Sequence, residues 1–268
     1  MECNSYLEPS VSRPNSLPTS PGRSTIGSPP AANLRHSTVP PPPLVAIASS
    51  YGGPVRSASG AKGGQSPVGY CVAVRLLVAT TNQNKVREIR QILDGLPVEV
   101  ATLDEWPGLE APEETGCTFE ENARAKALYY AAATGELTVA EDSGLAIDAL
   151  DGMPGVESAR FGGANTSYPD KFALIYEALR AKGSLESSAR FVCALVLAKG
   201  DRVLFETRGI VEGRIAREPQ GDGGFGYDPI FFYPPYGLTL AEAGDLKAAV
   251  SHRGKAFRAL GAFLRSQR

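Results

Sequence analysis

From residue 71 onward, short apolar runs alternate with segments of helical periodicity, and this alternation limits the possible folds more than any other feature. Residues 75–81 form an apolar, partly β-branched run that predicts a strand, and Val86, Ile89 and Leu93 then recur at helical spacing. Further strands are expected at 98–103, 137–141, 146–150, 189–198 and 203–215, and the last two form a hairpin. Further helices are expected at about 118–134, around 172–179 and from 251 onward. The pattern predicts an α/β protein with a mixed sheet and flanking helices.

The first 70 residues have a different composition. They hold 12 of the 21 prolines and 13 serines, with five basic and two acidic residues. Such a segment has too little apolar surface to offset the entropy of ordering, so residues 1–70 are expected to be a disordered tail and 71–268 the folded domain. The tail composition fits an organelle transit peptide and equally a start codon assigned too far upstream. Its longest apolar run, 44–48, is too short for a secretory signal, so a cytoplasmic location is expected, or an organelle if the tail is a transit peptide.

Charge and hydropathy argue against two classes of partner. The 27 basic and 29 acidic residues give a net charge of −2, whereas proteins that bind nucleic acid electrostatically carry a basic excess. The longest apolar run, 191–198, is far shorter than the roughly 20 residues that span a bilayer. Neither a nucleic acid nor a membrane is expected as a partner.

The junction between the first strand and the first helix is a candidate phosphate site. Free backbone N–H groups and the positive end of a helix dipole meet there, and a lysine in the first turn adds a point charge. The alternative is an ordinary Thr or Asn cap with a solvated lysine. A P-loop is excluded because the chain has no GxxxxGK[ST] sequence. The residues of this junction are Thr80, Thr81, Asn82, Gln83, Asn84 and Lys85.

Two acidic pairs are candidates for metal binding or proton transfer. Glu113 and Glu114 precede a helix, whereas Glu141 and Asp142 are expected at the carboxyl end of the strand 137–141, before a turn into a cleft. Carboxylates of this kind suit Mg²⁺, which binds through one or two of them together with substrate phosphates. The alternative is a solvated strand end.

A glycine-rich loop and a basic cluster follow later in the chain. The loop 221–229 formally matches GxGxxG, but it lacks the strand and helix of a dinucleotide site. Its Phe225 and Tyr227 are suited to stack on a base, and Asp228 to accept from base or ribose donors; the alternative is a structural turn. Lys247, His252 and Arg253 gather near the start of the last helix and could hold phosphates or a purine edge. No GxSxG elbow supports a triad that uses His252. Together the four signals indicate a Mg²⁺-dependent enzyme that acts on a nucleotide.

Five ordered segments resemble the inosine triphosphate pyrophosphatase family, also called Ham1-like or non-canonical purine NTP pyrophosphatases. The segments are 79–88, 114–123, 140–145, 223–231 and 251–256. The resemblance covers nearly all of 75–265 and implies an elongated, two-lobed α/β fold with a central cleft, usually in a homodimer. It also implies Mg²⁺-dependent hydrolysis of dITP, ITP and XTP to the nucleoside monophosphate and pyrophosphate.

The resemblance assigns expected roles by position. Asp142 matches the general base and metal ligand, Glu113 a further metal ligand and Ser143 a substrate contact. Residues 80–85 match the loop that grips the triphosphate, with Lys85 nearest the phosphates. The residues expected to contact the base are Phe225, Gly226, Tyr227 and Asp228, and those expected to hold base and phosphates are Lys247, His252 and Arg253. His252 and Arg253 are expected to donate to the oxo group at the six-position of the purine, where adenine carries an amino group.

Two other functions compete with this reading. The first is a pyrophosphatase for other modified nucleotides, as in Maf-like relatives of similar fold. The second is a non-catalytic nucleotide-binding module with the same phosphate grip. The presence of both Asp142 and Lys85 favours catalysis.

Overall fold

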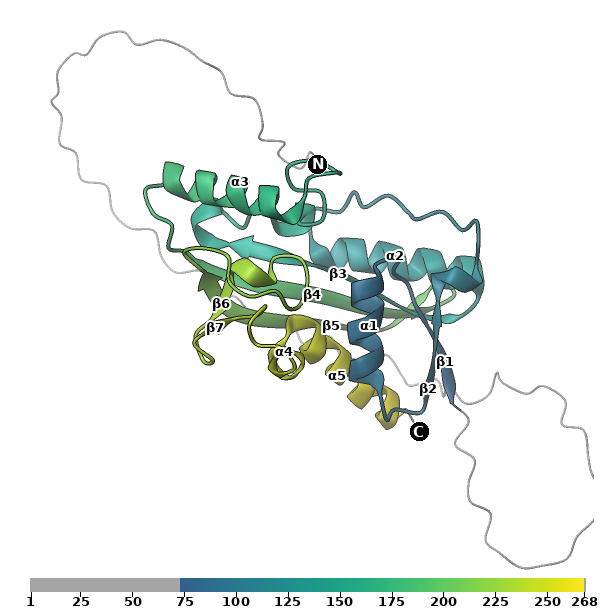
Figure 1. Cartoon of the computed structure of the whole chain (residues 1–268). Helices are drawn as coiled ribbons and strands as arrows, with labels where there is room; N and C mark the ends of the chain where they lie inside the picture. The colour runs from purple at the N-terminus through teal and green to yellow at the C-terminus, as the bar shows by residue number, and fades with distance from the viewer. Residues whose placement is uncertain (1–72, 268) are drawn as a thin grey trace, which may run out of the picture. The chain divides into compact units, whose positions relative to one another are not determined.

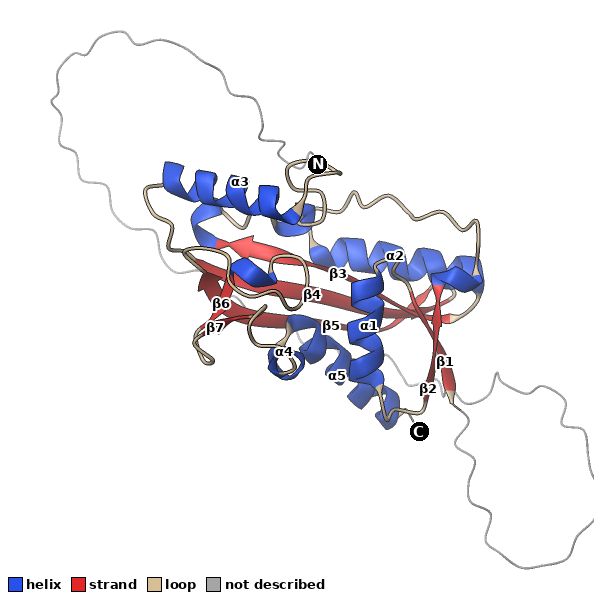
Figure 2. Ribbon diagram, viewed as in Figure 1, coloured by secondary structure: helices blue, strands red, loops and turns tan. Residues whose placement is uncertain are grey.

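The computed structural model describes residues 73–267, and a seven-stranded mixed sheet runs through this part of the chain (Figures 1 and 2). The strand order is β2-β1-β3-β4-β5-β6-β7; β1 is parallel to β2 and β3, and every other pair is antiparallel. The predicted α/β class is confirmed. The strands are β1 (Val74–Val78), β2 (Val98–Thr102), β3 (Leu137–Ile147), β4 (Ser188–Lys199), β5 (Arg202–Ile215), β6 (Phe231–Tyr233) and β7 (Leu238–Thr239). The predicted disordered tail, 1–70, lies outside the described residues.

Within residues 73–267, five α-helices accompany the sheet, and three clusters of buried side chains join them to it. They are α1 (Gln83–Leu93), α2 (Phe119–Thr134), α3 (Tyr168–Ala181), α4 (Leu246–Val250) and α5 (His252–Ser266). On one face α2 packs its alanines against β4, which the small side chains allow at close range. On the other face α1 and α5 pack against β3 and β4, while α3 covers the far end of β3 (Figure 2). The sheet is therefore covered on both faces where the acidic pair of β3 lies.

Strand β3 is longer than the sequence predicts. Two strands, 137–141 and 146–150, were expected with Glu141 and Asp142 at the end of the first. Instead β3 runs unbroken over Leu137–Ile147, because the apolar strand β4 pairs with it along its whole length. Unpaired backbone groups in a buried sheet are costly, so the ladder continues through the acidic pair. Because neighbouring side chains of a strand point to opposite faces, Glu141 lies on the α1–α5 face and Asp142 on the α2 face.

Local sequence signals set the starts of the helices next to the site. Thr118 caps α2 by accepting a hydrogen bond from the backbone N–H of Glu121 at 3.1 Å. The Glu121 carboxylate in turn accepts from the backbone N–H of Cys117 at 2.8 Å. Asn82 caps α1 in the same way. The short elements β6, β7 and α4 were not predicted, since two to five residues show no periodicity.

None of the helices in the described part of the chain is both long and apolar enough to cross a membrane.

Candidate active site

A cleft with a volume of about 320 Å³ opens between the β1–α1 junction, β3, α2, the loop 225–228 and the start of α5. The predicted site residues that line it are Thr80, Thr81, Asn82, Lys85, Asp142, Ser143, Phe225, Gly226, Tyr227, Asp228, Lys247, His252 and Arg253. Gln83, Asn84 and Glu113 are exposed and are not among its lining residues. Glu114 lines the cleft in place of its neighbour Glu113. Segments far apart in the sequence thus meet in one cavity.

At the start of α1 the side chain of Asn82 accepts hydrogen bonds from backbone N–H groups that could otherwise bind an anion. Its Oδ1 accepts from the backbone N–H groups of Asn84 at 3.0 Å and Lys85 at 3.2 Å. Both readings of this junction therefore hold in part: Asn82 is a helix cap, and Lys85 is not a solvated lysine. The Lys85 ammonium lies 3.1 Å from the Glu141 carboxylate and lines the cleft. Lys85 therefore contributes a positive charge to this end of the cleft.

Asp142 presents a buried carboxylate to the cleft. Only 6 % of its surface is exposed, and its Oδ2 accepts a hydrogen bond from Asn122 Nδ2 at 3.2 Å. Its Oδ1 lies 3.5 Å from Lys126 Nζ. Burial raises the pKa of Asp142 above its usual value, although the nearby Lys126 ammonium opposes this shift. A carboxylate with a raised pKa is a better proton acceptor than an exposed aspartate.

Lys126 is a site residue that the sequence analysis missed. Its Nζ contacts Glu114 at 2.7 Å as well as Asp142 at 3.5 Å, and its side chain is 12 % exposed. Burial opposes its charge, but Asp142 and then Glu114 raise its pKa, so Lys126 is a cation. A signal was present: Asn122, Lys126 and Tyr130 follow one another at four-residue spacing on one face of an alanine-rich helix. All three lie inside the segment 118–134, for which the sequence predicted a helix but no functional role.

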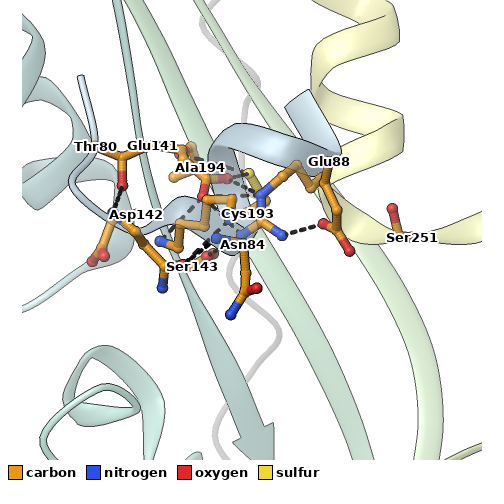
Figure 3. A network of polar contacts seen from close by, with 12 residues as sticks. Thr80, Asn84, Glu88, Glu141, Asp142, Ser143, Cys193, Ala194 and Ser251 are labelled. Atoms are coloured by element: carbon orange, nitrogen blue, oxygen red, sulfur yellow. Dashed lines mark hydrogen bonds and ion pairs between the residues drawn. The ribbon is translucent and has the colours of Figure 1, made fainter. Parts of the chain in front are cut away.

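On the opposite face of β3, Glu141 is the centre of a buried ion network (Figure 3). Its carboxylate accepts from Arg253 Nε at 3.0 Å and from Arg253 Nη2 at 2.7 Å. The Cys193 thiol donates to Glu141 Oε2 at 2.8 Å. Although burial opposes ionisation, Arg253 and Lys85 hold the pKa of Glu141 well below its usual range. Glu141 is thus a buried anion surrounded by donors.

Most N–H groups of the Arg253 guanidinium donate hydrogen bonds to other side chains of the protein. Besides Glu141, its Nη1 donates to Glu88 at 2.6 Å and its Nη2 to Ser143 Oγ at 3.1 Å. The guanidinium also lies 5.6 Å from the ring centroid of Phe225, and the residue is 1 % exposed. Arg253 therefore joins α5 to β3 and α1, and it supports the loop that carries Phe225. This anchoring role was not part of the sequence prediction.

Asp228 and Lys247 hold the aromatic loop. Asp228 Oδ2 accepts from Lys247 Nζ at 2.7 Å and from the backbone N–H of Phe225 at 2.8 Å. Lys247 Nζ also contacts Glu88 at 2.6 Å and lies 4.7 Å from the Phe225 ring centroid. Burial raises the pKa of Asp228, against the opposing effect of Lys247. These contacts fix the backbone of the loop and place the Phe225 ring at the cleft wall.

His252 is a neutral side chain at the same end of the cleft. Its ring stacks on Phe191 with the centroids 4.9 Å apart. Burial and the neighbouring Arg253 charge put its pKa well below the usual value. Among the described residues its buried Nδ1 has no hydrogen-bond partner. A buried polar atom without a protein partner is costly unless a ligand or water satisfies it.

The chain is similar in sequence to curated proteins over most of its described residues. A dITP/XTP pyrophosphatase of Exiguobacterium sp. (strain AT1b) is 48 % identical over 190 residues, covering 70 % of this chain and 96 % of the relative. The protein of the same name from Geobacter sulfurreducens is 46 % identical over 183 residues, covering 68 % and 92 %.

Two solved structures and one family model are also similar to this chain. A HAM1 protein from Coxiella burnetii superposes with a TM-score of 0.67 at 38 % identity, covering 72 % of this chain and 99 % of that one. The Staphylococcus aureus Ham1 protein gives a TM-score of 0.65 at 35 % identity, covering 72 % and 100 %. The model of the Ham1 family matches residues 76–263. This match spans most of the described residues and includes every segment that forms the cleft, so the chain belongs to the Ham1 family.

Proposed function

We propose that this chain hydrolyses the non-canonical purine nucleoside triphosphates dITP, ITP and XTP to the nucleoside monophosphate and pyrophosphate. The observation that carries the proposal is one cleft that combines a buried carboxylate, Asp142, with the cations Lys85 and Lys126 and an aromatic wall at Phe225. A triphosphate needs the cations, a base needs the aromatic face, and hydrolysis needs the carboxylate. Relatives 46–48 % identical carry the name dITP/XTP pyrophosphatase.

The residues of the cleft suit a magnesium ion. Asp142 and Glu114 come from different elements, and Lys126 contacts both, so the two carboxylates converge on one region. Among the described residues no group of three or more His, Cys, Asp or Glu side chains is arranged for a metal. Two carboxylates with substrate phosphates and water are nevertheless a usual set for Mg²⁺. A bound Mg²⁺ would neutralise part of the triphosphate charge.

The reaction then follows from the positions of the side chains. Lys85 and Lys126 attract and orient the triphosphate. Asp142 accepts a proton from a water molecule whose oxygen bonds to the α-phosphorus. The bond from the α-phosphorus to the bridging oxygen breaks, and pyrophosphate leaves with the electron pair. The raised pKa of Asp142 favours the proton transfer.

The end of the cleft that carries His252 is expected to discriminate against adenine nucleotides. We expect the neutral ring of His252, which lines the cleft, to donate a ring N–H to the six-oxo group of hypoxanthine or xanthine. Adenine carries an amino group there, so this N–H would be left unpaired in a buried place, which strongly disfavours binding. Arg253 contributes less to this choice, because Glu141, Glu88 and Ser143 take most of its donors.

The test measures pyrophosphate release from dITP, XTP and dATP with Mg²⁺, for the wild type and Asp142→Asn. Rapid turnover of dITP and XTP and slow turnover of dATP are expected, with loss of activity in EDTA. Equal turnover of dATP and dITP would contradict the selectivity and favour a broader pyrophosphatase. Binding without turnover in the wild type would indicate a non-catalytic module.

A matched pair of variants decides which glutamate binds the metal. Both Glu113 and Glu114 precede α2, but only Glu114 lines the cleft. Glu114→Gln is expected to raise the Mg²⁺ concentration needed for half-maximal activity, whereas Glu113→Gln leaves it unchanged. The reverse result would restore Glu113 as the ligand, as the family resemblance implies.

We further expect a homodimer in the cytoplasm. Several large apolar side chains are exposed, including Leu246 at 57 % and Met153 at 47 %. Surface of this kind is compatible with an interface between copies. Sedimentation equilibrium of the full chain gives the oligomeric state, and mass spectrometry of the native N-terminus shows whether residues 1–70 are present or removed.

A further inference from the structure

A tyrosine from outside the five motifs stands at the aromatic end of the cleft. Tyr168 is the first residue of α3, and it lines the cleft together with Phe225, Gly226 and Tyr227. Its ring meets that of Tyr227 edge-on, with the centroids 5.3 Å apart and the planes at 88°. Because none of the motifs includes α3, tertiary packing alone brings this side chain to the cleft.

The ring of Tyr168 is held in place by a buried lysine. Lys171, one turn further along α3, has its ammonium nitrogen 4.9 Å from the ring centroid. That ammonium donates to the backbone carbonyl of Ala159, and Lys171 is only 3 % exposed. A cation fixed over an aromatic face stabilises the orientation of the ring. A ligand that meets this ring therefore has little conformational entropy to remove from it.

The hydroxyl group of Tyr168 lies against the loop 225–228, and it has no protein partner among the described residues. A Cβ built at Gly226 would meet Tyr168 Oη at 3.6 Å, so the hydroxyl lies directly beside the backbone of the loop. Tyr168 is 38 % exposed, and within residues 73–267 its Oη forms no hydrogen bond. A hydroxyl group at an exposed residue without a protein partner is expected to be hydrogen-bonded by solvent water. A base that displaces this water must replace its hydrogen bond or lose affinity.

We propose that Tyr168 is a base-contacting residue whose ring closes the aromatic end of the cleft and whose hydroxyl forms a hydrogen bond with the edge of an oxo-purine. The proposal rests on the function proposed above and extends it to a residue outside the family motifs. The edge of an oxo-purine sets a carbonyl acceptor beside a ring N–H donor. The hydroxyl, which both donates and accepts, finds a partner there in either orientation.

The variant Tyr168→Phe removes only the hydroxyl oxygen and keeps the ring. We expect the KM for dITP to rise about tenfold with kcat unchanged, because a hydrogen bond made equally in the ground state and the transition state is lost. The midpoint of thermal unfolding should not change, since the hydroxyl has no partner in the described part of the chain. Tyr129→Phe is the matched control: Tyr129 is also 38 % exposed but does not line the cleft, and its variant should keep wild-type kinetics.

Each result separates this proposal from the proposed function. A wild type that turns over dITP with the expected selectivity, beside a Tyr168→Phe variant with unchanged KM, overturns the role of Tyr168 alone. A fall in the unfolding midpoint, or a fall in kcat with unchanged KM, assigns Tyr168 a structural or positioning role and also overturns base contact. A wild type without turnover of dITP overturns both proposals.

Discussion

Glu141 and Asp142 are neighbours in the sequence, but they belong to two different charge networks on opposite faces of β3. Glu141 is enclosed by Arg253, Lys85 and the Cys193 thiol. Asp142 faces Asn122 and Lys126 across the cleft wall. Arg253 and Lys85 keep Glu141 ionised, whereas burial makes Asp142 more basic. Neighbouring side chains of a strand point to opposite faces of the sheet. Glu141 therefore holds a buried ion network together, whereas Asp142 is the candidate general base.

Asp142→Asn tests the candidate general base. The amide keeps the shape and burial of the side chain but cannot accept the proton, so kcat for dITP should fall by about 10²–10⁴-fold. The unfolding midpoint should stay the same or rise, because a buried carboxylate is replaced by a neutral group. Single-turnover rates measure the effect. Activity within a few-fold of wild type would exclude Asp142 as the base.

Lys126→Met is expected to move the acidic limb of the pH–rate profile to higher pH. Lys126 lowers the pKa of Asp142 and so partly offsets the rise that burial causes. Without that cation the carboxylate binds its proton more tightly, and a higher pH is needed to free it. The profile of kcat/KM for dITP measures the shift. The control, Lys182→Met, removes an exposed lysine that contacts Asp151 and should leave the pH–rate profile unchanged. An unshifted profile in Lys126→Met would contradict the effect of Lys126 on the pKa of Asp142.

Arg253→Ala should strongly destabilise the fold. The change leaves Glu141 buried with fewer partners, and breaking a buried ion pair in this way typically costs about 3–5 kcal/mol. Arg253→Lys keeps the charge but not the forked donors, so it should restore only part of the stability. Urea unfolding measures both. Arg217→Ala breaks an exposed pair with Glu186 and serves as the control that should not change stability. Equal stability of Arg253→Ala and wild type would show that the buried pair is not needed.

Glu141→Gln should change how stability depends on pH. The pKa of Glu141 is lower in the folded chain than its usual 4.5, so its charge stabilises the fold above that pH. This contribution is lost as the pH falls below 4.5 towards the lower folded pKa. The variant should therefore be less stable than wild type at neutral pH, and the gap should narrow in acid. Free energies of unfolding measured at several pH values give the gap; a constant difference would contradict the assignment.

Gly209→Ala should displace the start of α5. A Cβ at Gly209 would lie 2.0 Å from the backbone carbonyl oxygen of His252, and backbone cannot move aside cheaply. Overpacking of this kind typically costs about 1–3 kcal/mol, and here it would also shift His252 and Arg253 and lower activity. A Cβ at Gly261, within α5, would meet the tip of the flexible Leu96 side chain at 2.9 Å and otherwise only ordinary contacts near 4 Å, so Gly261→Ala should be tolerated. Thermal unfolding and dITP turnover compare the two; similar behaviour would contradict the prediction.

Local sequence patterns were sufficient to predict the fold class and most of the residues that line the cleft. The alternation of apolar runs and helical spacing predicted β1, α1, β2, α2 and the β4–β5 hairpin, because each depends on neighbours within a few residues. Short motifs also located Lys85, Asp142 and the loop around Phe225, and the structure brings these together in one cleft. Their order along the chain carried the family resemblance, which the family match over 76–263 confirms.

Other features required contacts between distant segments. The sequence alone determined which residues are charged, aromatic or small, and approximately where the longer helices and strands lie. Only the tertiary structure decided that β3 continues through its acidic pair, that Glu114 rather than Glu113 lines the cleft, and that Lys126 and Tyr168 join it. It also decided that Arg253 pairs with Glu141 across 112 positions of sequence. The physical reason is that strand pairing, burial and the partners of a charge depend on which elements pack together, and local periodicity does not contain that information.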